Sequence, residues 1–223
     1  MQIDEVLRSP REAAGSRPAR PAVLVAPVAG LLLGVLDFVW IKFVPFPLGD
    51  LGNSIAVWAV AAFLLTLLNR WSLPVGVLAA IVQLVVAVPA YYLAAAVIQH
   101  DDLRNMWDAN AVLWAGFGVI AALVFGTGGV LARRASVPRL LRDVALALPG
   151  AVLFAEAALQ LRRIGDPSYS AGGQAASGAV LIVLGLATTA LITPGWPRRG
   201  IVLVFTLPLT AAGFVLLTLT GFR

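Results

Sequence analysis

Long apolar runs, separated by short polar segments, recur along the whole chain and limit its fold more than any other feature. The first run, residues 22–44, is interrupted by charge only at Asp37 and Lys42. A run of about 20 apolar residues is long enough for a helix to cross the hydrocarbon core of a bilayer. Because that core offers no water to the backbone, each run must pair its N–H and C=O groups within a helix. The chain is therefore predicted to be an all-α polytopic transmembrane helix bundle.

Composition agrees with this class and leaves little room for a second folded unit. Hydrophobic residues make up 60% of the 223 positions and charged residues only 12%, well outside the usual composition of soluble domains. The segments between the runs are too short to fold separately. We expect a disordered cytoplasmic tail over residues 1–21, which are rich in Arg and Pro, followed by a single transmembrane helical domain over residues 22–223.

About seven runs qualify as spans. The sixth is the weakest, because it is short unless it includes flanking residues, and the segment before it, residues 165–177, has the Gly, Ser and Pro content of a loop. If this run does not cross, the count falls to six and the C-terminus moves to the inner side. The predicted spans cover about residues 22–44, 53–68, 74–98, 111–131, 142–163, 179–192 and 201–219.

The distribution of basic residues predicts the orientation. Lys and Arg are enriched in the cytoplasmic segments of membrane proteins. With seven spans and the N-terminus inside, eleven of the 16 basic residues lie on the inner side and five on the outer side. We therefore expect a cytoplasmic N-terminus and a location in the cell membrane. The inner residues are Arg8, Arg11, Arg17, Arg20, Arg70, Arg133, Arg134, Arg139, Arg142, Arg198 and Arg199; the outer ones are Lys42, Arg104, Arg162, Arg163 and Arg223.

Several kinds of chemistry are disfavoured by the residues present. The net charge of +5 is better explained by membrane topology than by nucleic acid, which we do not expect as a partner. The chain has no cysteine and one histidine, His100, beside two aspartates in a predicted loop, so we expect neither a metal nor another cofactor. No catalytic motif of a hydrolase or intramembrane protease occurs, and an enzyme is the less favoured interpretation.

Two carboxylates, Asp37 and Glu156, lie deep inside predicted spans, where a charge must face protein or water. Counting at about 1.5 Å per residue places both in the outer half of the membrane. Polar or aromatic residues from five spans share this depth, which predicts an outward-facing pocket for ligand binding or proton coupling. Its candidate residues are Asp37, Asn53, Trp58, Tyr91, Tyr92, Trp114 and Glu156, with Arg162 and Arg163 at its rim.

A purely structural role explains the same residues. Each acid can accept hydrogen bonds from neighbouring Asn, Ser or Tyr side chains and hold helices together, or one of the two can be protonated. Tyr and Trp are also typical anchors at the membrane surface. The residues alone leave both interpretations open for the acids and favour anchoring for the aromatics.

Several of these residues together resemble an uncharacterised family of small bacterial polytopic membrane proteins, a domain of unknown function. The resemblance covers about residues 28–165 and departs from the family pattern at Pro89-Ala90 and at Ala157. It implies a helical membrane protein and carries no known activity. The features that carry it are Asn53-Ser54 followed by Trp58, the Tyr91-Tyr92 pair, the glycines from Gly126 to Gly129, and Glu156.

Two functions remain in competition. The first is a small-molecule transporter, or the substrate-binding membrane component of one, because prolines such as Pro89, Pro149 and Pro208 interrupt predicted spans and broken helices often line transport sites. The second is an accessory protein that packs against a partner membrane protein or a second copy through small-residue faces, such as the pair Gly30 and Gly34. The expected partners are therefore the lipid bilayer and either a small ligand or another membrane protein.

Overall fold

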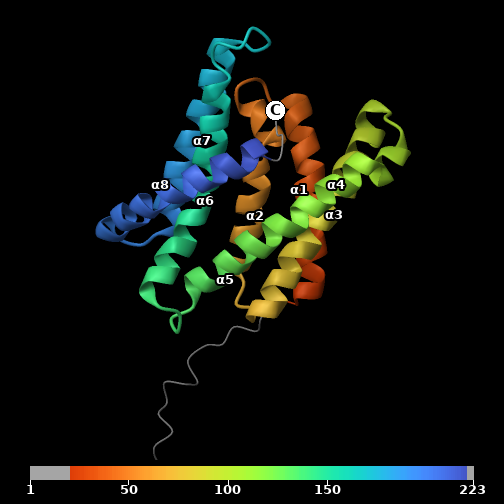
Figure 1. Ribbon diagram of the computed structural model, residues 1–223. Helices are drawn as coiled ribbons and strands as arrows, with labels where there is room; N and C mark the ends of the chain where they lie inside the picture. Colours follow the sequence, from red (N-terminus) through yellow and green to blue (C-terminus); the bar gives the residue numbers. More distant parts are fainter. Residues whose placement is uncertain (1–20, 220–223) are drawn as a thin grey trace, which may run out of the picture.

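The computed structural model describes residues 21–219, and within them the chain is helical throughout, with no strand. The tail expected over residues 1–21 lies almost wholly outside the described part. Eight α-helices follow one another, joined by short 3-10 turns and one π-helical segment (Figure 1). They are α1 (Ala22–Phe43), η1 (Leu48–Asn53), α2 (Ile55–Leu68), α3 (Leu73–Gln99), η2 (Leu103–Trp107), α4 (Ala109–Ala121), the π segment η3 (Ala122–Gly126), α5 (Thr127–Arg133), α6 (Arg139–Arg162), α7 (Ala171–Ile192) and α8 (Trp196–Leu219).

Six helices are long and apolar enough to cross a membrane. They are α1, α3, the continuous helix formed by α4, η3 and α5, and then α6, α7 and α8. The helix α2 is equally apolar but has only 14 residues, which is about 21 Å at the helical rise and shorter than a hydrocarbon core of about 30 Å. The chain is therefore an all-helical protein with the helices of a multi-pass membrane protein.

The segment predicted as a loop over residues 165–177 is non-helical only as far as Ser170, and the prediction was wrong for its second half, which is helical. The helix α7 begins at Ala171, directly after Ser170, whose hydroxyl accepts a hydrogen bond from the backbone N–H of Gly173 at 3.3 Å. Serine at this position satisfies a free N–H of the first turn and favours helix initiation despite the glycines. The weak sixth span is in consequence 22 residues long.

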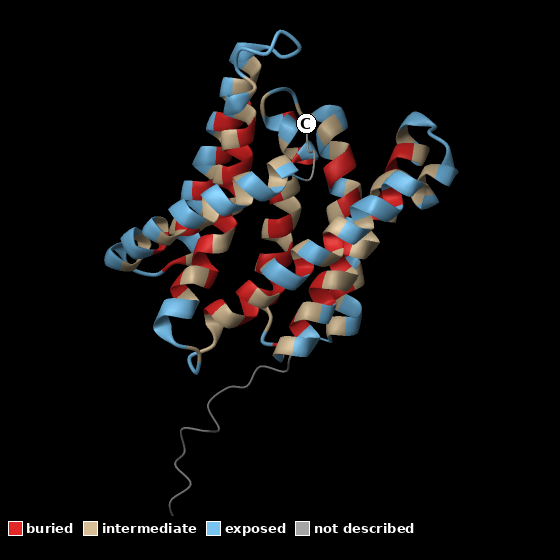
Figure 2. Ribbon diagram, in the orientation of Figure 1, coloured by how far each residue is buried: buried red, intermediate tan, exposed pale blue. Residues whose placement is uncertain are grey.

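The short helix α2 lies at the centre of the bundle. It contacts α1, α3 and α4 on one side and α6 on the other, and α5 also packs against it. Figure 1 shows α4 and α5 as one long helix that crosses diagonally past α2. Buried residues, drawn in red in Figure 2, run along α2 and the facing sides of its neighbours, whereas α8 exposes most of its surface. The core therefore surrounds α2.

Connections alternate between the two ends of the bundle. The start of α1, the turn between α2 and α3 and the link between α5 and α6 lie at the lower end of Figure 1, while the links that follow α1, α3 and α6 lie at the upper end. The helix α2 therefore runs from one end of the bundle toward the other, as the longer helices do.

Glycines allow the helices to approach one another closely. A Cβ on Gly34 would lie 2.8 Å from the backbone nitrogen of Tyr91, and one on Gly30 would lie 3.0 Å from the Cβ of Val86. The GxxxG pair therefore packs α1 against α3, as such pairs do in membranes. Gly126 faces Ala80 of α3 in the same way, with a virtual Cβ 2.7 Å from the Ala80 Cβ.

Candidate functional site

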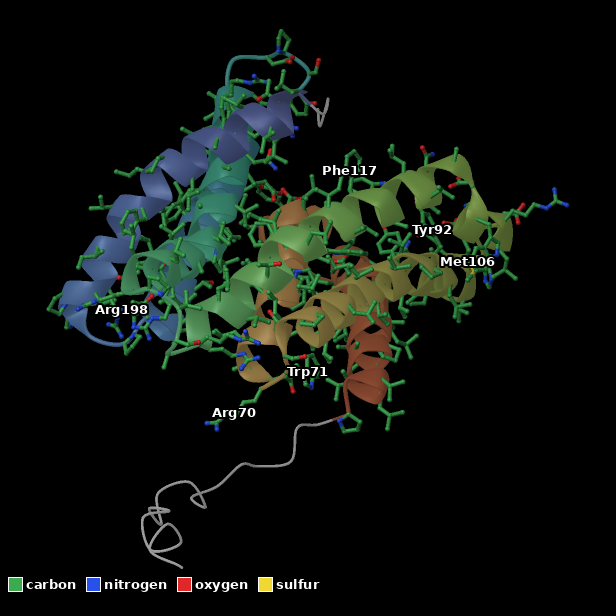
Figure 3. All side chains as sticks on the ribbon, turned by 60° about the horizontal axis from the view of Figure 1, so that its bottom comes forward. Arg70, Trp71, Tyr92, Met106, Phe117 and Arg198 are labelled. Carbon is green, nitrogen blue, oxygen red and sulfur yellow. The ribbon has the colours of Figure 1, made fainter. Side chains whose placement is uncertain are left out.

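A cavity of about 260 Å³ lies between α1, η1, α2, α3 and α4. Six of the seven residues predicted for the pocket line it, and they come from all five of these elements. Figure 3 labels two lining residues, Tyr92 on α3 and Phe117 on α4. The lining residues are Asp37, Gly52, Asn53, Ser54, Ile55, Trp58, Leu84, Val88, Tyr91, Tyr92, Trp114, Phe117, Gly118 and Ala121.

Asp37 is the one charged residue among those that line the cavity. Its side chain is 8% exposed and is engaged by a hydrogen bond from Trp58, whose indole N–H can only donate. Asp37 lies three residues after Gly34, so the close contact between α1 and α3 sets its position beside the tyrosines of α3. The cavity therefore contains a single carboxylate in a wall that is otherwise uncharged.

Aromatic rings form much of the remaining wall. Tyr91 and Tyr92 meet edge to face, with centroids 5.5 Å apart, and Tyr91 also packs on Phe38 at 5.4 Å. On the opposite helix Trp114 and Phe117 form a second edge-to-face pair at 6.1 Å. Edge-to-face packing stabilises the rings in fixed orientations. The predicted surface anchors therefore also line a cavity.

Phe117 was missed by the sequence prediction. It follows Trp114 by three residues, and residues three apart share one face of a helix. That spacing is the signal that could have identified it. Asn53 at the end of η1 is exposed, and Trp114 is 41% exposed, so the cavity reaches the surface beside η1.

Glu156 lies outside this cavity, although it was predicted to share it. Its Oε2 accepts hydrogen bonds from the Ser54 hydroxyl at 2.9 Å and from the backbone N–H of Ala56 at 2.8 Å. Ser54 is the N-cap of α2, so the carboxylate of α6 accepts from one free N–H of the first turn and lies at the positive dipole end of that helix. Glu156 thus acts as an N-terminal cap supplied by another helix.

A second, very small cavity of about 10 Å³ lies beside Glu156, on the side of α7. Asp50 of η1 lines it and accepts a hydrogen bond from the hydroxyl of Ser177. A space of this size holds about one water molecule. The polar groups here join η1, α6 and α7 rather than form a ligand pocket.

The opposite end of α2 is held by a cation. The Nε of Arg133 donates to the carbonyl of Thr66 at 3.1 Å, and its Nη2 donates to the carbonyl of Trp71. A guanidinium at the C-terminus of a helix satisfies free carbonyls and complements the negative dipole end. The short central helix therefore has an acid from α6 at one end and a base from α5 at the other.

Arg162 and Arg163, predicted at the rim, lie away from the larger cavity. Arg162 stacks over Phe214 of α8 at 5.5 Å, and Arg163 lies over Tyr169 at 5.2 Å and hydrogen-bonds Gln160 at 3.1 Å. These contacts belong to the group formed by α6, α7 and α8. The two arginines share the predicted depth but face a different side of the bundle.

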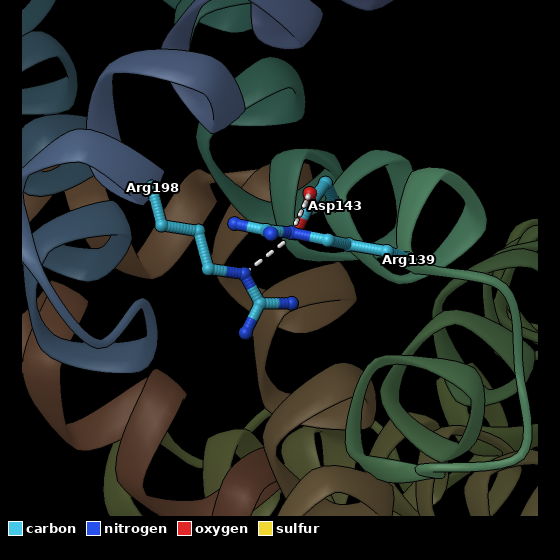
Figure 4. A network of polar contacts seen from close by, with 3 residues as sticks. All are labelled: Arg139, Asp143 and Arg198. Atoms are coloured by element: carbon cyan, nitrogen blue, oxygen red, sulfur yellow. Dashed lines mark hydrogen bonds and ion pairs between the residues drawn. The ribbon is translucent and has the colours of Figure 1, made fainter.

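A buried ion pair at the other end of α6 was also missed (Figure 4). Asp143 is 3% exposed and accepts a hydrogen bond from Nε of Arg198 on α8 at 2.6 Å. Arg139, one turn earlier on α6, lies 3.8 Å from the same carboxylate and is largely exposed. The sequence signal that could have identified this pair is the presence of opposite charges, Asp143 and Arg198, at the same end of two predicted spans. The pair fastens α6 to α8.

The fold and the cavity define the class as a multi-pass helical membrane protein with a small aromatic cavity near one end of the bundle. Within that class, the chain belongs to a family of unknown function (DUF6518), whose model matches residues 13–221. The resemblance drawn from the sequence is thereby confirmed. No curated protein and no solved structure matches the chain.

Proposed function

We propose that this protein binds a small molecule in the larger cavity from the outer side of the cell membrane, as a transporter or as the substrate-binding membrane component of one. The observation that carries the proposal is the cavity itself, in which one buried carboxylate of α1 shares the lining with aromatic residues of α2, α3 and α4. An apolar cavity with a few polar groups is the usual form of a small-molecule site.

We further propose seven crossings with the N-terminus inside. Support comes from the alternating connections and from α2, whose two ends are paired by Glu156 and Arg133 and whose flanks are covered by other helices. A short helix surrounded by protein need not reach both surfaces of the lipid. The split of eleven inner to five outer basic residues favours this orientation.

A π-helical segment next to the cavity supports the same proposal. The segment η3 begins at Ala122, one residue after the lining residue Ala121. Insertions of this kind often occur at functional sites because the extra residue shifts the register of the side chains that follow.

The proposal can be tested by filling the cavity. Ala121→Phe places a ring in the cavity, and Ile120→Phe, on the exposed face of the same helix, is the matched control. The purified protein in detergent is heated with a panel of small cationic, neutral and anionic compounds, since a ligand raises the midpoint of unfolding. We expect at least one compound to stabilise the native chain and Ile120→Phe, and not Ala121→Phe. Stabilisation that survives Ala121→Phe, or none with any compound, contradicts the proposal.

An accessory role is the alternative, and its original motivation is weakened. Gly30 and Gly34 pack against α3, and Gly128 and Gly129 pack against α6 and α2. These small-residue faces are occupied within the chain. Several large apolar side chains of α8 are exposed in the described part of the chain, but lipid covers such a surface as well as a partner does.

A further inference from the structure

We infer that the ligand of the larger cavity is a small organic ammonium ion with one positive charge, an inference that rests on the proposed function. Buried carboxylates also occur at the small void beside Glu156 and in the ion pair at Asp143. The void beside Glu156 has room for about one water molecule, and Asp143 is already paired with the cation of Arg198. Among the described residues, the larger cavity combines space for a ligand with a carboxylate that forms no ion pair.

The charge of the lining selects the sign of the ligand. Asp37 is 8% exposed and is the one ionisable acid of the lining, which contains no Lys, Arg or His. Its hydrogen bond comes from the neutral Trp58 indole, and no Lys, Arg or His in the described part of the chain forms an ion pair with it. Buried charges in proteins are generally paired. An anion would be repelled here, whereas a cation supplies the missing partner.

The aromatic residues select an organic cation over a metal ion. Two aromatic pairs, Tyr91 with Tyr92 and Trp114 with Phe117, line the cavity together with Trp58. The faces of Trp and Tyr attract ammonium groups, and more strongly where water is excluded. Hard metal ions instead require several oxygen ligands, which this mostly apolar lining does not provide.

The dimensions of the cavity limit the rest of the ligand. A volume of about 260 Å³ lies just below the range of about 300–1,000 Å³ found for drug-sized ligands. Apart from Asp37, the polar side chains are an amide, a hydroxyl and two phenols. The hydroxyl of Ser54 already donates to Glu156. The cavity therefore suits a compact monoamine or quaternary ammonium compound and disfavours sugars, polyamines and peptides.

Three probes of similar shape and different charge test the inference. Choline is the cation. Its uncharged carbon isostere is 3,3-dimethylbutan-1-ol, and the corresponding anion is 3,3-dimethylbutanoate. Each is titrated into the purified full-length protein in detergent, with tryptophan emission and thermal unfolding as readouts, because Trp58 and Trp114 line the cavity. We expect choline to bind and the other two to bind at least about tenfold more weakly.

Two substitutions locate the effect. Asp37→Asn should weaken choline binding by at least about tenfold, as the loss of a desolvated charge partner does, while Asp166→Asn, in an exposed turn, should leave it unchanged. Trp114→Leu should weaken binding several-fold and Trp114→Phe should restore much of it. Because Trp114 is 41% exposed, both variants are expected to fold.

The outcomes separate this inference from the proposed function. If dimethylbutanol binds as tightly as choline, or if Asp37→Asn keeps the affinity for choline, the ligand is not recognised by charge. The inference is then overturned, and the cavity remains a ligand site. The inference is also overturned if choline, tetramethylammonium and phenyltrimethylammonium all fail to bind while a neutral or anionic compound of the wider panel binds. If no compound of any charge binds, the proposed function fails as well.

Discussion

Two carboxylates that look alike in the sequence have different environments. Glu156 receives two donors from the N-terminus of α2, so its charge is compensated within the protein. Asp37 faces a cavity and has one neutral donor. The hydrogen bonds of Glu156 therefore favour the structural interpretation for that residue. The position of Asp37 at the cavity favours ligand contact. The two acids line separate cavities and therefore do not form one site.

Glu156→Ala should destabilise the protein without affecting ligand binding. The substitution leaves two buried donors, the Ser54 hydroxyl and the Ala56 N–H, without their acceptor. An unpaired buried donor costs about 1–3 kcal/mol. Thermal unfolding in detergent should show a lower midpoint for Glu156→Ala and an unchanged one for Asp166→Asn. Equal midpoints for the two variants would contradict the capping role.

Asp143→Asn should be more destabilising than Arg139→Met, although both residues touch the same ion pair. Asp143 has a side chain that is 4% exposed and loses its bond to Arg198, whereas Arg139 is 70% exposed. Breaking a buried pair on one side costs about 3–5 kcal/mol, because the other charge remains buried, and an exposed pair is worth at most about 1 kcal/mol.

A double-mutant comparison makes this test sharper. Removing both charges with Asp143→Asn and Arg198→Met should cost less than the sum of the single changes. The four unfolding midpoints provide the comparison. Additive losses would show that the two side chains act independently, against the 2.6 Å contact between them.

At the level of helices, the sequence predicts how deep in the membrane a residue lies better than it predicts which neighbouring helix that residue faces. Counting residues along each span placed Asp37, Trp58 and the tyrosines at one level, and the structure brings them together. The same count placed Glu156 at that level, but α6 lies on the far side of α2. Depth follows from the helical rise, which is local. The direction that a residue faces depends on which helices pack together, and counting residues along each span does not predict those pairs.

The start of α7 illustrates a second limit. Glycine and serine in residues 165–177 indicated a loop, yet Ser170 caps a helix that includes most of that segment. The propensity of a few residues is a weak signal when a cap and neighbouring helices favour the helical state. The GxxxG pair in α1 was easier to interpret, because close approach between helices requires the absence of a side chain.

Gly34→Val should disrupt the contact between α1 and α3 and the position of Asp37. A Cβ at this position would lie 2.8 Å from the backbone nitrogen of Tyr91, and backbone cannot move aside at low cost. Gly116→Ala is the matched control, since nothing lies within 4 Å of its Cβ position. We expect Gly34→Val to reduce the yield of monodisperse protein and its unfolding midpoint sharply. Gly116→Ala should leave both unchanged or raise them slightly. Comparable behaviour of the two variants would argue against close packing at Gly34.

For the whole molecule, the class of fold was accessible from composition and the length of apolar runs, because lipid permits few structures. The central position of α2 could not be predicted in this way, because its 14 residues give no sign that the other helices pack around it. Its short length is accommodated by Glu156 and Arg133, which pair its ends from two other helices. The cavity forms on one side of this central helix, between it and α1, α3 and α4.

The proposed route for the ligand requires a cavity that water can enter from outside, and the absence of native cysteine makes this directly measurable. Ala121→Cys probes the cavity wall, and Ile120→Cys, on a residue that is 60% exposed on the outer face of the same helix, probes lipid. Arg104→Cys and Arg134→Cys report the outer and inner loops. Intact cells are treated with a membrane-impermeant maleimide, which reacts only with thiols that water can reach and ionise.

We predict labelling at positions 121 and 104 and none at positions 120 and 134. Labelling at 104 without 121 would mean that the cavity is closed to the outside, which contradicts the proposed route for the ligand. Labelling at 134 without 104 would invert the topology and place the cavity on the cytoplasmic side.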